Sequence, residues 1–310
     1  MKKTISVFLL FSFIFLMLMF PQETVRAAGD GLILWYTSLL PTLLPLSIFS
    51  NILITSGYFH YITKNLYAVV KPFYPISRSG VFPLFAGLLF GFPLGSKITA
   101  DLVEKKELSK EEGDILICIC NNLSPVFINS YVFRECLKRP DLLPFGFAIL
   151  YLPPLIWGYF KLKKCADYKR TDIKKPASRS QLNFKIIDAG IMNGFETLTK
   201  LGGYIMLFSI LNAFIRMLPH SSKLAETICA GILEVTNGVH AVTAISSPAL
   251  RFGLALGFTA FGGICGLAQT ASMIKDSGLS VSCYLKAKLI FALLGGGIGG
   301  FLFYMAALGL

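Results

Sequence analysis

The sequence is poor in charged residues and in the residue patterns on which most enzymes depend. Only 15% of its 310 residues are charged and 54% are hydrophobic, whereas a soluble domain carries roughly 25% charged residues. The three histidines lie far apart, and the sequence has no G-x-S-x-G, H-E-x-x-H or phosphate-binding-loop motif. The composition excludes an ordinary soluble domain, and the missing motifs argue against an enzyme.

The seven cysteines also lack a pattern that would give them a chemical role. No C-x-x-C pair and no cysteine–histidine metal spacing occurs, and most of the cysteines lie inside or beside apolar runs. We therefore interpret them as small packing residues, and we expect neither a metal ion nor a cofactor.

Long apolar runs are what the sequence has in their place. Several approach or exceed the ~20 residues that a helix needs to cross a bilayer, and they are continuous rather than alternating. The sequence thus predicts an all-α polytopic membrane protein, with the lipid bilayer as its main partner.

The net charge of +12 is concentrated in one segment between apolar runs. Nine lysines and arginines fall between Lys161 and Lys185, against only Asp167 and Asp172. A basic loop beside a membrane span is typical of the cytoplasmic side. We therefore expect residues 161–185 to form a cytoplasmic linker, and we do not expect nucleic acid as a partner.

The N-terminal segment allows two interpretations. Lys2 and Lys3 precede an apolar stretch from Ile5 to Phe20, and the following Val25-Arg26-Ala27 resembles a signal-peptidase site. Residues 1–28 are thus either a signal peptide or an uncleaved transmembrane anchor. The anchor is the interpretation that we favour, for a reason given with the family resemblance below.

The number of crossings conflicts with a cytoplasmic linker. With an inside N-terminus, five full spans before residue 161 would put the basic segment outside. One segment is therefore expected to be re-entrant, unless the first is cleaved. Val81–Leu94 and Ile115–Val132 are the candidates, because both contain helix-breaking residues, which are tolerated at membrane depth only inside protein or water.

One motif occurs twice. Residues 90–109 read FGFPLGSKITADLVEKKELS and residues 261–280 read FGGICGLAQTASMIKDSGLS, with seven identities in twenty ungapped positions. This predicts two related repeats, at 29–160 and 186–310, on either side of the basic linker. Internal repeats with glycine-broken apolar helices are typical of transporters that bind solute at the repeat interface.

The duplicated motif supplies small and polar candidates. Gly91, Gly95 and Thr99 have the i, i+4, i+8 spacing of one helical face. The second copy aligns with Gly262, Gly266 and Thr270, and Gln269 lies beside them. The glycines either let two helices pack closely or let a ligand approach the backbone.

Two further polar clusters interrupt apolar sequence. Asn121, Asn122 and Ser124 precede Pro125. Amides bind polar solutes well, although they can equally link helices or satisfy carbonyls that a proline frees.

The second cluster is Glu234, Thr236 and Asn237. A carboxylate at membrane depth usually has a role in function, although the T-N-G sequence also fits a turn in water.

Taken together, four segments resemble the nucleoside-recognition (Gate domain) family, in particular its YlbJ-like sporulation integral membrane proteins. The segments are GLILWYTSLLPTLLPLSIFSNIL, GFPLGSKITADL, NNLSPVFI and LEVTNG. The resemblance covers the chain from about Phe20 onward. It implies two Gate-like repeats with re-entrant or broken helices, an uncleaved first helix, a bacterial cell membrane and a role in spore formation.

Gate domains also occur in concentrative nucleoside transporters and in ferrous-iron permeases of the FeoB type, so the resemblance implies transport of a nucleoside-like solute or an ion. The leading hypothesis is a site for a small polar solute, with or without a coupling ion, lined by the polar residues named above. Its rival is a membrane scaffold for spore formation that transports nothing. The sequence leaves the oligomeric state, including a homo-oligomer, open.

Overall fold

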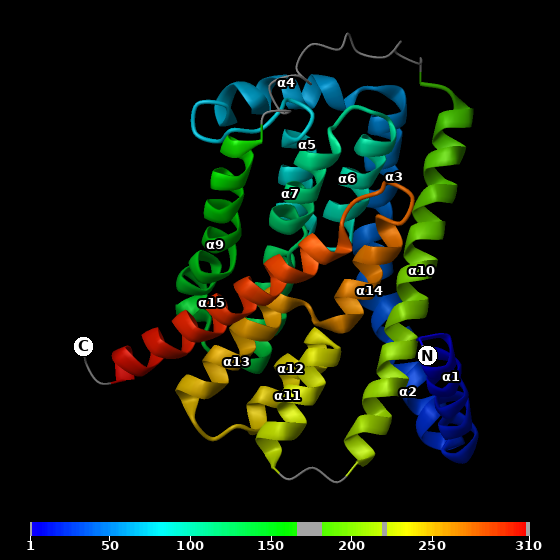
Figure 1. Ribbon diagram of the computed structural model, residues 1–310, viewed down its shortest axis with the longest axis vertical. Helices are drawn as coiled ribbons and strands as arrows, with labels where there is room; N and C mark the ends of the chain where they lie inside the picture. Colours follow the sequence, from blue (N-terminus) through cyan, green and yellow to red (C-terminus); the bar gives the residue numbers. More distant parts are fainter. Residues whose placement is uncertain (1, 166–181, 219–221, 308–310) are drawn as a thin grey trace.

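The protein is all-α, as expected from the sequence. A computed structural model describes residues 2–165, 182–218 and 222–307, and within these ranges every regular element is a helix (Figure 1). Five helical segments of the described chain are long and apolar enough to cross a membrane, or up to seven if two bent helix pairs each count as one. This confirms a polytopic helical membrane protein. Most of the basic linker, residues 166–181, lies outside the described residues.

The N-terminal part consists of helices that pack against one long helix from the middle of the chain. The helices are α1 (Lys2–Met19), α2 (Pro21–Leu34), a π-helical turn (Trp35–Leu39), α3 (Leu40–Ser56) and α4 (Phe59–Val70). The chain bends by 104° between α1 and α2 and by 95° between α3 and α4. The second bend occurs because α3 ends at Gly57, which has a positive φ of 75°.

The long helix α10 (Phe184–Met217) runs antiparallel to α2 and α3. The contacts run in opposite order along the two partners: Gly31 lies against Ser209, and Gly190 lies against Ile52. The Trp35 indole Nε1 donates a hydrogen bond of 2.8 Å to the Leu198 carbonyl between these points. Together these helices form one wall of the molecule (Figure 1).

The remaining helices follow the same order of elements on either side of α10. Before it come α5 (Val81–Phe90), α6 (Leu94–Glu104), α7 (Lys110–Cys120), α8 (Pro125–Phe127) with a π-helical turn (Ile128–Cys136), and α9 (Leu143–Lys164). After it come α11 (Lys223–Leu233), α12 (Val235–Ala241), α13 (Pro248–Phe261), α14 (Gly263–Met273) and α15 (Val281–Ala307). Each group contains a short helix pair, a broken long segment and an unbroken long helix.

The first short pair, α5 and α6, is a hairpin that enters and leaves the bundle at the same end. Its tip is Gly91-Phe92-Pro93, where Gly91 has a positive φ of 80°. The two arms touch: a methyl group added at Gly95 would lie 3.1 Å from the Gly87 Cα. The segment Val81–Leu94 thus lies in a helical hairpin, which is the backbone shape that re-entry requires. Gly91 does not lie on the helical face of Gly95 and Thr99, because its φ ends α5 and α6 begins only at Leu94.

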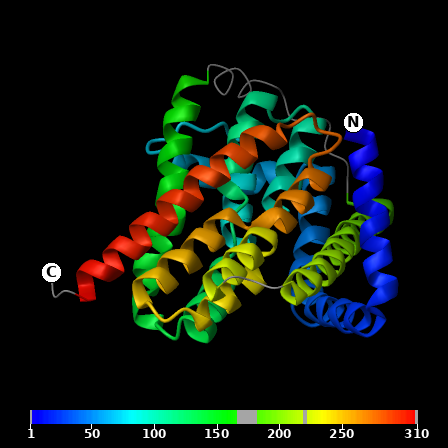
Figure 2. The same ribbon diagram turned by 60° about the horizontal axis from the view of Figure 1, so that its bottom comes forward.

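The second short pair, α11 and α12, is a hairpin that approaches from the opposite end. Its tip is the single residue Glu234, in an extended conformation. A methyl group added at Gly238 would lie 2.2 Å from the Gly231 Cα, so the two arms are in backbone contact. The hairpins enter from opposite ends, because α5 follows the α4 end of the molecule and α11 follows the other end of α10 (Figures 1 and 2).

Two longer segments are broken but continue in one direction. Lys110–Cys136 and Pro248–Met273 are both long enough to cross a membrane. The expectation that Ile115–Val132 is re-entrant is therefore wrong. Its Asn and Pro residues interrupt the helix at 121–124 without turning the chain back. Asn121 and Asn122 lie within this break and not on a helix, because α7 ends at Cys120.

Helices α13 and α15 meet along a seam of glycines. A methyl group added at Gly253 would lie 2.8 Å from the Gly296 carbonyl oxygen and 3.2 Å from the Gly300 Cα. Close approach of backbones through small residues is a common way to pack helices in membranes. The two helices are thereby joined along most of α13.

The hairpin packing gives a stability prediction. A methyl group at Gly95 would lie 2.6 Å from the Cys120 carbonyl oxygen, so we expect Gly95→Ala to destabilise the protein by about 1–3 kcal/mol through overpacking. Gly203→Ala on α10 is the control, since no atom lies within 4 Å of the added methyl. Thermal unfolding in detergent measures both. A Gly95→Ala protein that melts no lower than Gly203→Ala would contradict the packing described.

Candidate functional site

The four helix breaks meet in two pairs inside the bundle. In the first pair, the Phe92 N–H at the α5–α6 tip donates a 2.7 Å hydrogen bond to the Asn122 carbonyl in the α7–α8 break. In the second, the Glu234 tip lies against Gly263 in the α13–α14 break, where an added methyl would be 3.0 Å from the Glu234 Cα. Each hairpin tip therefore contacts the break of the long segment that follows it.

Phe92 joins the two pairs. Methyl groups added at Gly262 and Gly266 would find the Phe92 ring as their nearest neighbour, at 3.7 Å and 3.4 Å. Both glycines come from the second copy of the duplicated motif, while Phe92 belongs to the first. A protein side chain, rather than open space, therefore occupies the approach to these glycines.

Asn121 is the most connected of the sequence candidates. Its side chain is fully buried. Its Oδ1 accepts from the Ser96 N–H at 3.2 Å, and its Nδ2 donates to Thr270 Oγ1 at 2.8 Å and to Tyr284 OH at 3.1 Å. One amide thus connects α6, α14 and α15 to the end of α7, and its bonds leave no polar group of this side chain without a partner.

Asn122 faces a charged residue that the sequence analysis did not single out. Its Oδ1 accepts a 2.7 Å hydrogen bond from the Lys288 ammonium on α15, and its Nδ2 donates to the Ile119 carbonyl at 2.8 Å. Lys288 is only 2% exposed. Ser124 has a local role, because its hydroxyl caps α8 by accepting from the Phe127 N–H at 3.2 Å.

Glu234 lies at a hairpin tip inside the bundle and not in a solvent loop. Its carboxylate accepts from the Thr236 and Asn237 N–H groups at 2.9 and 2.8 Å, and from Asn237 Nδ2 at 2.8 Å. It therefore caps the N-terminus of α12, a position that favours negative charge. Asn237 Oδ1 in turn accepts from Arg216 at 3.1 Å, and the Thr236 carbonyl accepts from the Tyr131 hydroxyl at 3.1 Å.

The two motif threonines share a local geometry but differ in their surroundings. Thr99 Oγ1 donates to the Gly95 carbonyl and Thr270 Oγ1 donates to the Gly266 carbonyl, both at 2.8 Å. Only Thr270 also accepts from Asn121. Gln269 differs again: its Nε2 donates to Cys265 Sγ at 3.1 Å, while its buried Oε1 has no hydrogen-bond partner.

The structure thus brings the predicted residues together in two linked networks. Asn121, Asn122 and Thr270 belong to one, which extends to Tyr284 and Lys288. The other consists of Glu234, Thr236 and Asn237, and it extends to Tyr131 and Arg216. The lysine had a visible signal, since Lys286 and Lys288 both stand at the start of the C-terminal apolar run, but the tyrosines and Phe92 resemble ordinary membrane-helix residues.

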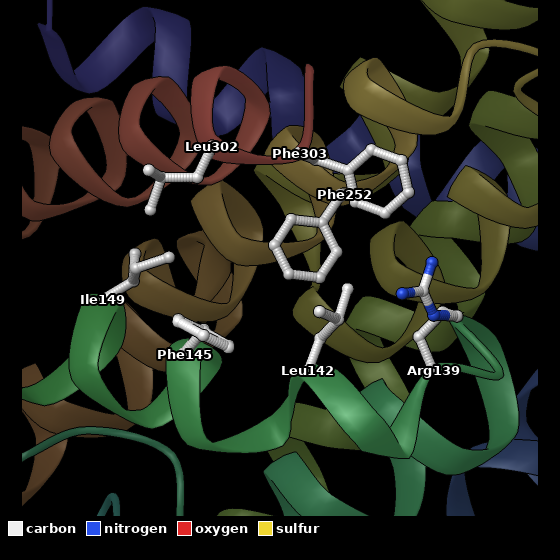
Figure 3. Close-up of a pocket in the computed structure, with 7 residues that line it drawn as sticks. All are labelled: Arg139, Leu142, Phe145, Ile149, Phe252, Leu302 and Phe303. Atoms are coloured by element: carbon white, nitrogen blue, oxygen red, sulfur yellow. The ribbon is translucent and has the colours of Figure 1, made fainter. Parts of the chain in front are cut away.

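A separate pocket lies between α9, α13 and α15 and contains none of the predicted site residues. Its volume is about 360 Å³, and its lining is apolar apart from Arg139 (Figure 3). The Arg139 guanidinium lies 5.5 Å from the Phe303 ring centre and pairs with Asp141 at 2.7 Å. Because Asp141 neutralises the cation, the pocket is essentially an apolar groove toward the surface.

The fold and the buried polar networks define a polytopic α-helical membrane protein whose broken helices meet within the bundle. The sequence is similar to the sporulation integral membrane protein YlbJ of Bacillus subtilis (strain 168). The two are 23% identical over 306 residues, which cover 87% of this chain and 75% of YlbJ. No family model and no solved structure matches the chain.

The Asn121 network predicts unequal effects of two matched substitutions. Thr270→Val and Thr99→Val each remove a hydroxyl bonded to its own helix, but only Thr270→Val takes an acceptor from Asn121. We expect Thr270→Val to lower the free energy of unfolding by about 1 kcal/mol more than Thr99→Val. Chemical denaturation in detergent measures the difference, which should vanish in an Asn121→Ala background. Equal losses in the native background would contradict it.

Proposed function

We propose that the protein moves a small polar solute, nucleoside-like or ionic, across the membrane through a site at the four helix breaks. The observation that carries the proposal is the meeting of these breaks deep in an apolar bundle. Discontinuous helices expose backbone N–H and C=O groups and helix termini, and membrane transporters use these groups to bind solutes and coupling ions. The nine predicted polar side chains supply further donors and acceptors; they are Thr99, Asn121, Asn122, Ser124, Glu234, Thr236, Asn237, Gln269 and Thr270.

The order of the elements supports the same proposal. A hairpin, a broken segment and an unbroken helix occur before α10 and again after it, and the two hairpins enter from opposite ends (Figure 1). Repeats of opposite orientation with broken helices at their interface are typical of secondary transporters. When the two orders of helices are compared, the α5–α6 tip corresponds to Glu234, and the 121–124 break corresponds to Gly262-Gly263. The two copies of the duplicated motif therefore do not occupy corresponding positions, and the motif does not itself define the repeat.

Gln269 is the residue with spare binding capacity in this proposal. Its side chain is 4% exposed and its Oε1 lacks a hydrogen-bond partner. A buried amide oxygen without a donor is costly, by about 1–3 kcal/mol. A hydroxyl or amine of a solute would donate a hydrogen bond to this Gln269 oxygen. The amide nitrogen of the same side chain already donates to Cys265 Sγ.

Glu234 provides the test of transport. Proteoliposomes that contain the full chain should take up at least one solute from a panel of radiolabelled nucleosides and divalent cations. We expect Glu234→Gln to reduce that uptake by about tenfold, because it removes the charge of a carboxylate at membrane depth. Glu226→Gln, at the start of α11 and away from the hairpin tip, is the matched control and should transport like the native protein.

The rival is a membrane scaffold for spore formation, and one observation favours it. Asn121, Thr270 and Glu234 are already hydrogen-bonded within the protein, as residues that only hold helices together would be. The two proposals differ in Bacillus subtilis cells that lack YlbJ and produce this chain. If the panel shows no uptake while the Glu234→Gln chain restores sporulation as well as the native chain, the scaffold is correct and the transport proposal fails.

We further propose that residues 161–185 face the cytoplasm. Three of the nine cations are Lys161, Lys163 and Lys164, which lie in the last turn of α9, and a basic juxtamembrane segment favours this side. Cys165 directly follows α9 and Ser222 directly precedes α11. The end of α9 and the start of α11 lie at opposite ends of the molecule (Figure 1).

Thiol labelling tests the orientation. In a chain whose Cys229 and Cys283 are replaced by alanine, a membrane-impermeant maleimide should label Cys165 in inside-out vesicles but not in intact cells. A cysteine introduced by Ser222→Cys should show the reverse. Labelling of Cys165 in intact cells would invert the proposed orientation.

A further inference from the structure

Lys288 is a buried cation that neither the duplicated motif nor the proposed solute site explains. It lies two turns into α15, and its side chain is 2% exposed. Its Nζ donates one hydrogen bond, of 2.7 Å, to Asn122 Oδ1. Within the described part of the chain no carboxylate oxygen lies within 4 Å of Nζ. An ammonium in a membrane protein interior is normally paired or faces water.

The surroundings of the amine supply partial negative charge but no counter-ion. Asn122 lies two residues beyond Cys120, the last residue of α7. At such a helix end the last carbonyls lack partners and the helix dipole favours a cation. The Tyr284 ring centre lies 5.6 Å from Nζ. In transporters, such half-helix C-terminal ends coordinate the coupling Na⁺ or H⁺. The Lys288 amine therefore stands where a coupling cation would otherwise bind.

The groups that face this stretch of α15 are mostly neutral. On α7 they are the thiols of Cys118 and Cys120, together with Asp114, whose carboxylate accepts from the Ser280 N–H at 2.6 Å. The cation on α9 is Lys161, which lies 5.6 Å from the Trp157 ring centre. The α13 glycines of the seam lie against Ala292, Gly296 and Gly300, farther along α15, and α14 presents Thr270 near Tyr284. None of these neutralises an ammonium at Lys288.

We propose that Lys288 is a proton-binding site that controls the break between α7 and α8. When the amine takes a proton from water, its nitrogen lone pair forms the third N–H bond, and the ammonium holds Asn122 and the end of α7 against α15. When the proton leaves, the charge that binds the helix end is lost and the break loosens. The bound cation at this position is thus a proton on a side chain and not a metal ion.

The amine can be observed directly in the full-length protein. Protein with ¹³C at the lysine ε carbons and at the isoleucine δ1 methyls is titrated from about pH 5 to about pH 10 in detergent by NMR, without any added solute. We expect the chemical shift of the Lys288 ε carbon to show one single-proton transition, at a midpoint that differs from that of the exposed lysines. The Ile119 methyl, in the turn whose carbonyl bonds Asn122, should shift with the same midpoint.

Three variants separate the proton site from a purely structural contact. Lys288→Met should abolish the pH-dependent change of the Ile119 methyl shift. Lys288→Arg should keep that shift at its low-pH value at every pH, because arginine stays charged throughout this range. Lys286→Met, an exposed lysine two residues earlier on α15, is the matched control and should titrate like the native protein.

Two results overturn the proposal: a Lys288 ε carbon that keeps one shift across the whole range, or an Ile119 transition that survives in Lys288→Met. If the variants fail to fold, the native titration alone still decides. Because no transported solute is involved, failure here leaves the transport proposal standing, and failure of uptake leaves this one standing.

Discussion

Backbone hydrogen bonding in an apolar environment is the constraint on which the rest of this structure depends. A helix interrupted at membrane depth leaves N–H and C=O groups that neither lipid nor distant water can satisfy. Here groups of the protein itself form these hydrogen bonds. The Asn122 carbonyl takes the Phe92 N–H, and the Glu234 carboxylate takes two N–H groups of the next helix. In the first pair the hairpin tip and the broken segment satisfy one another directly, whereas in the second the Glu234 carboxylate satisfies its own hairpin.

The same constraint explains the residues at the breaks. Close backbone contact requires small residues, and a methyl group added at Gly91 would lie 2.6 Å from the Ser124 nitrogen. Gly91 and Gly262 also adopt a φ of 80°, which residues with a Cβ rarely adopt. Polar side chains such as Asn121 then fill the space around the breaks with donors and acceptors. Several of the buried polar side chains therefore lie around the breaks, among them Asn121, Asn122, Gln269 and Thr270.

Much of the fold follows from the sequence, and the site follows less well. Long apolar runs predict the helices, and glycine and proline mark three of the four interruptions. Helix-breaking residues predict re-entry at both Val81–Leu94 and Ile115–Val132, yet the first lies in a hairpin and the second continues in one direction. A break in a helix does not reveal whether the chain turns back or continues. The direction of the chain after a break is decided by packing between segments far apart in sequence, such as Gly87 against Cys120.

The candidate residues show the same limit. Asn121, Thr270 and Glu234 were visible as polar residues in apolar surroundings, but their partners were not. The contact from Asn121 to Thr270 joins residues 149 positions apart, and no local pattern encodes it. Nothing in the sequence distinguishes Phe92 from the other aromatic residues of the apolar segments, yet it fills the space beside Gly262 and Gly266. Lys288 could have been identified as an unusual lysine, although not as the partner of Asn122.

The glycine seam between α13 and α15 has a mechanical consequence. The backbones of α13 and α15 touch at Gly253, Gly296 and Gly300, so the helices cannot roll or slide past one another without opening gaps. The two helices therefore form one rigid body. Tyr284 and Lys288 stand on α15, so the two side chains that bond to Asn121 and Asn122 at the end of α7 are carried by a support that includes α13.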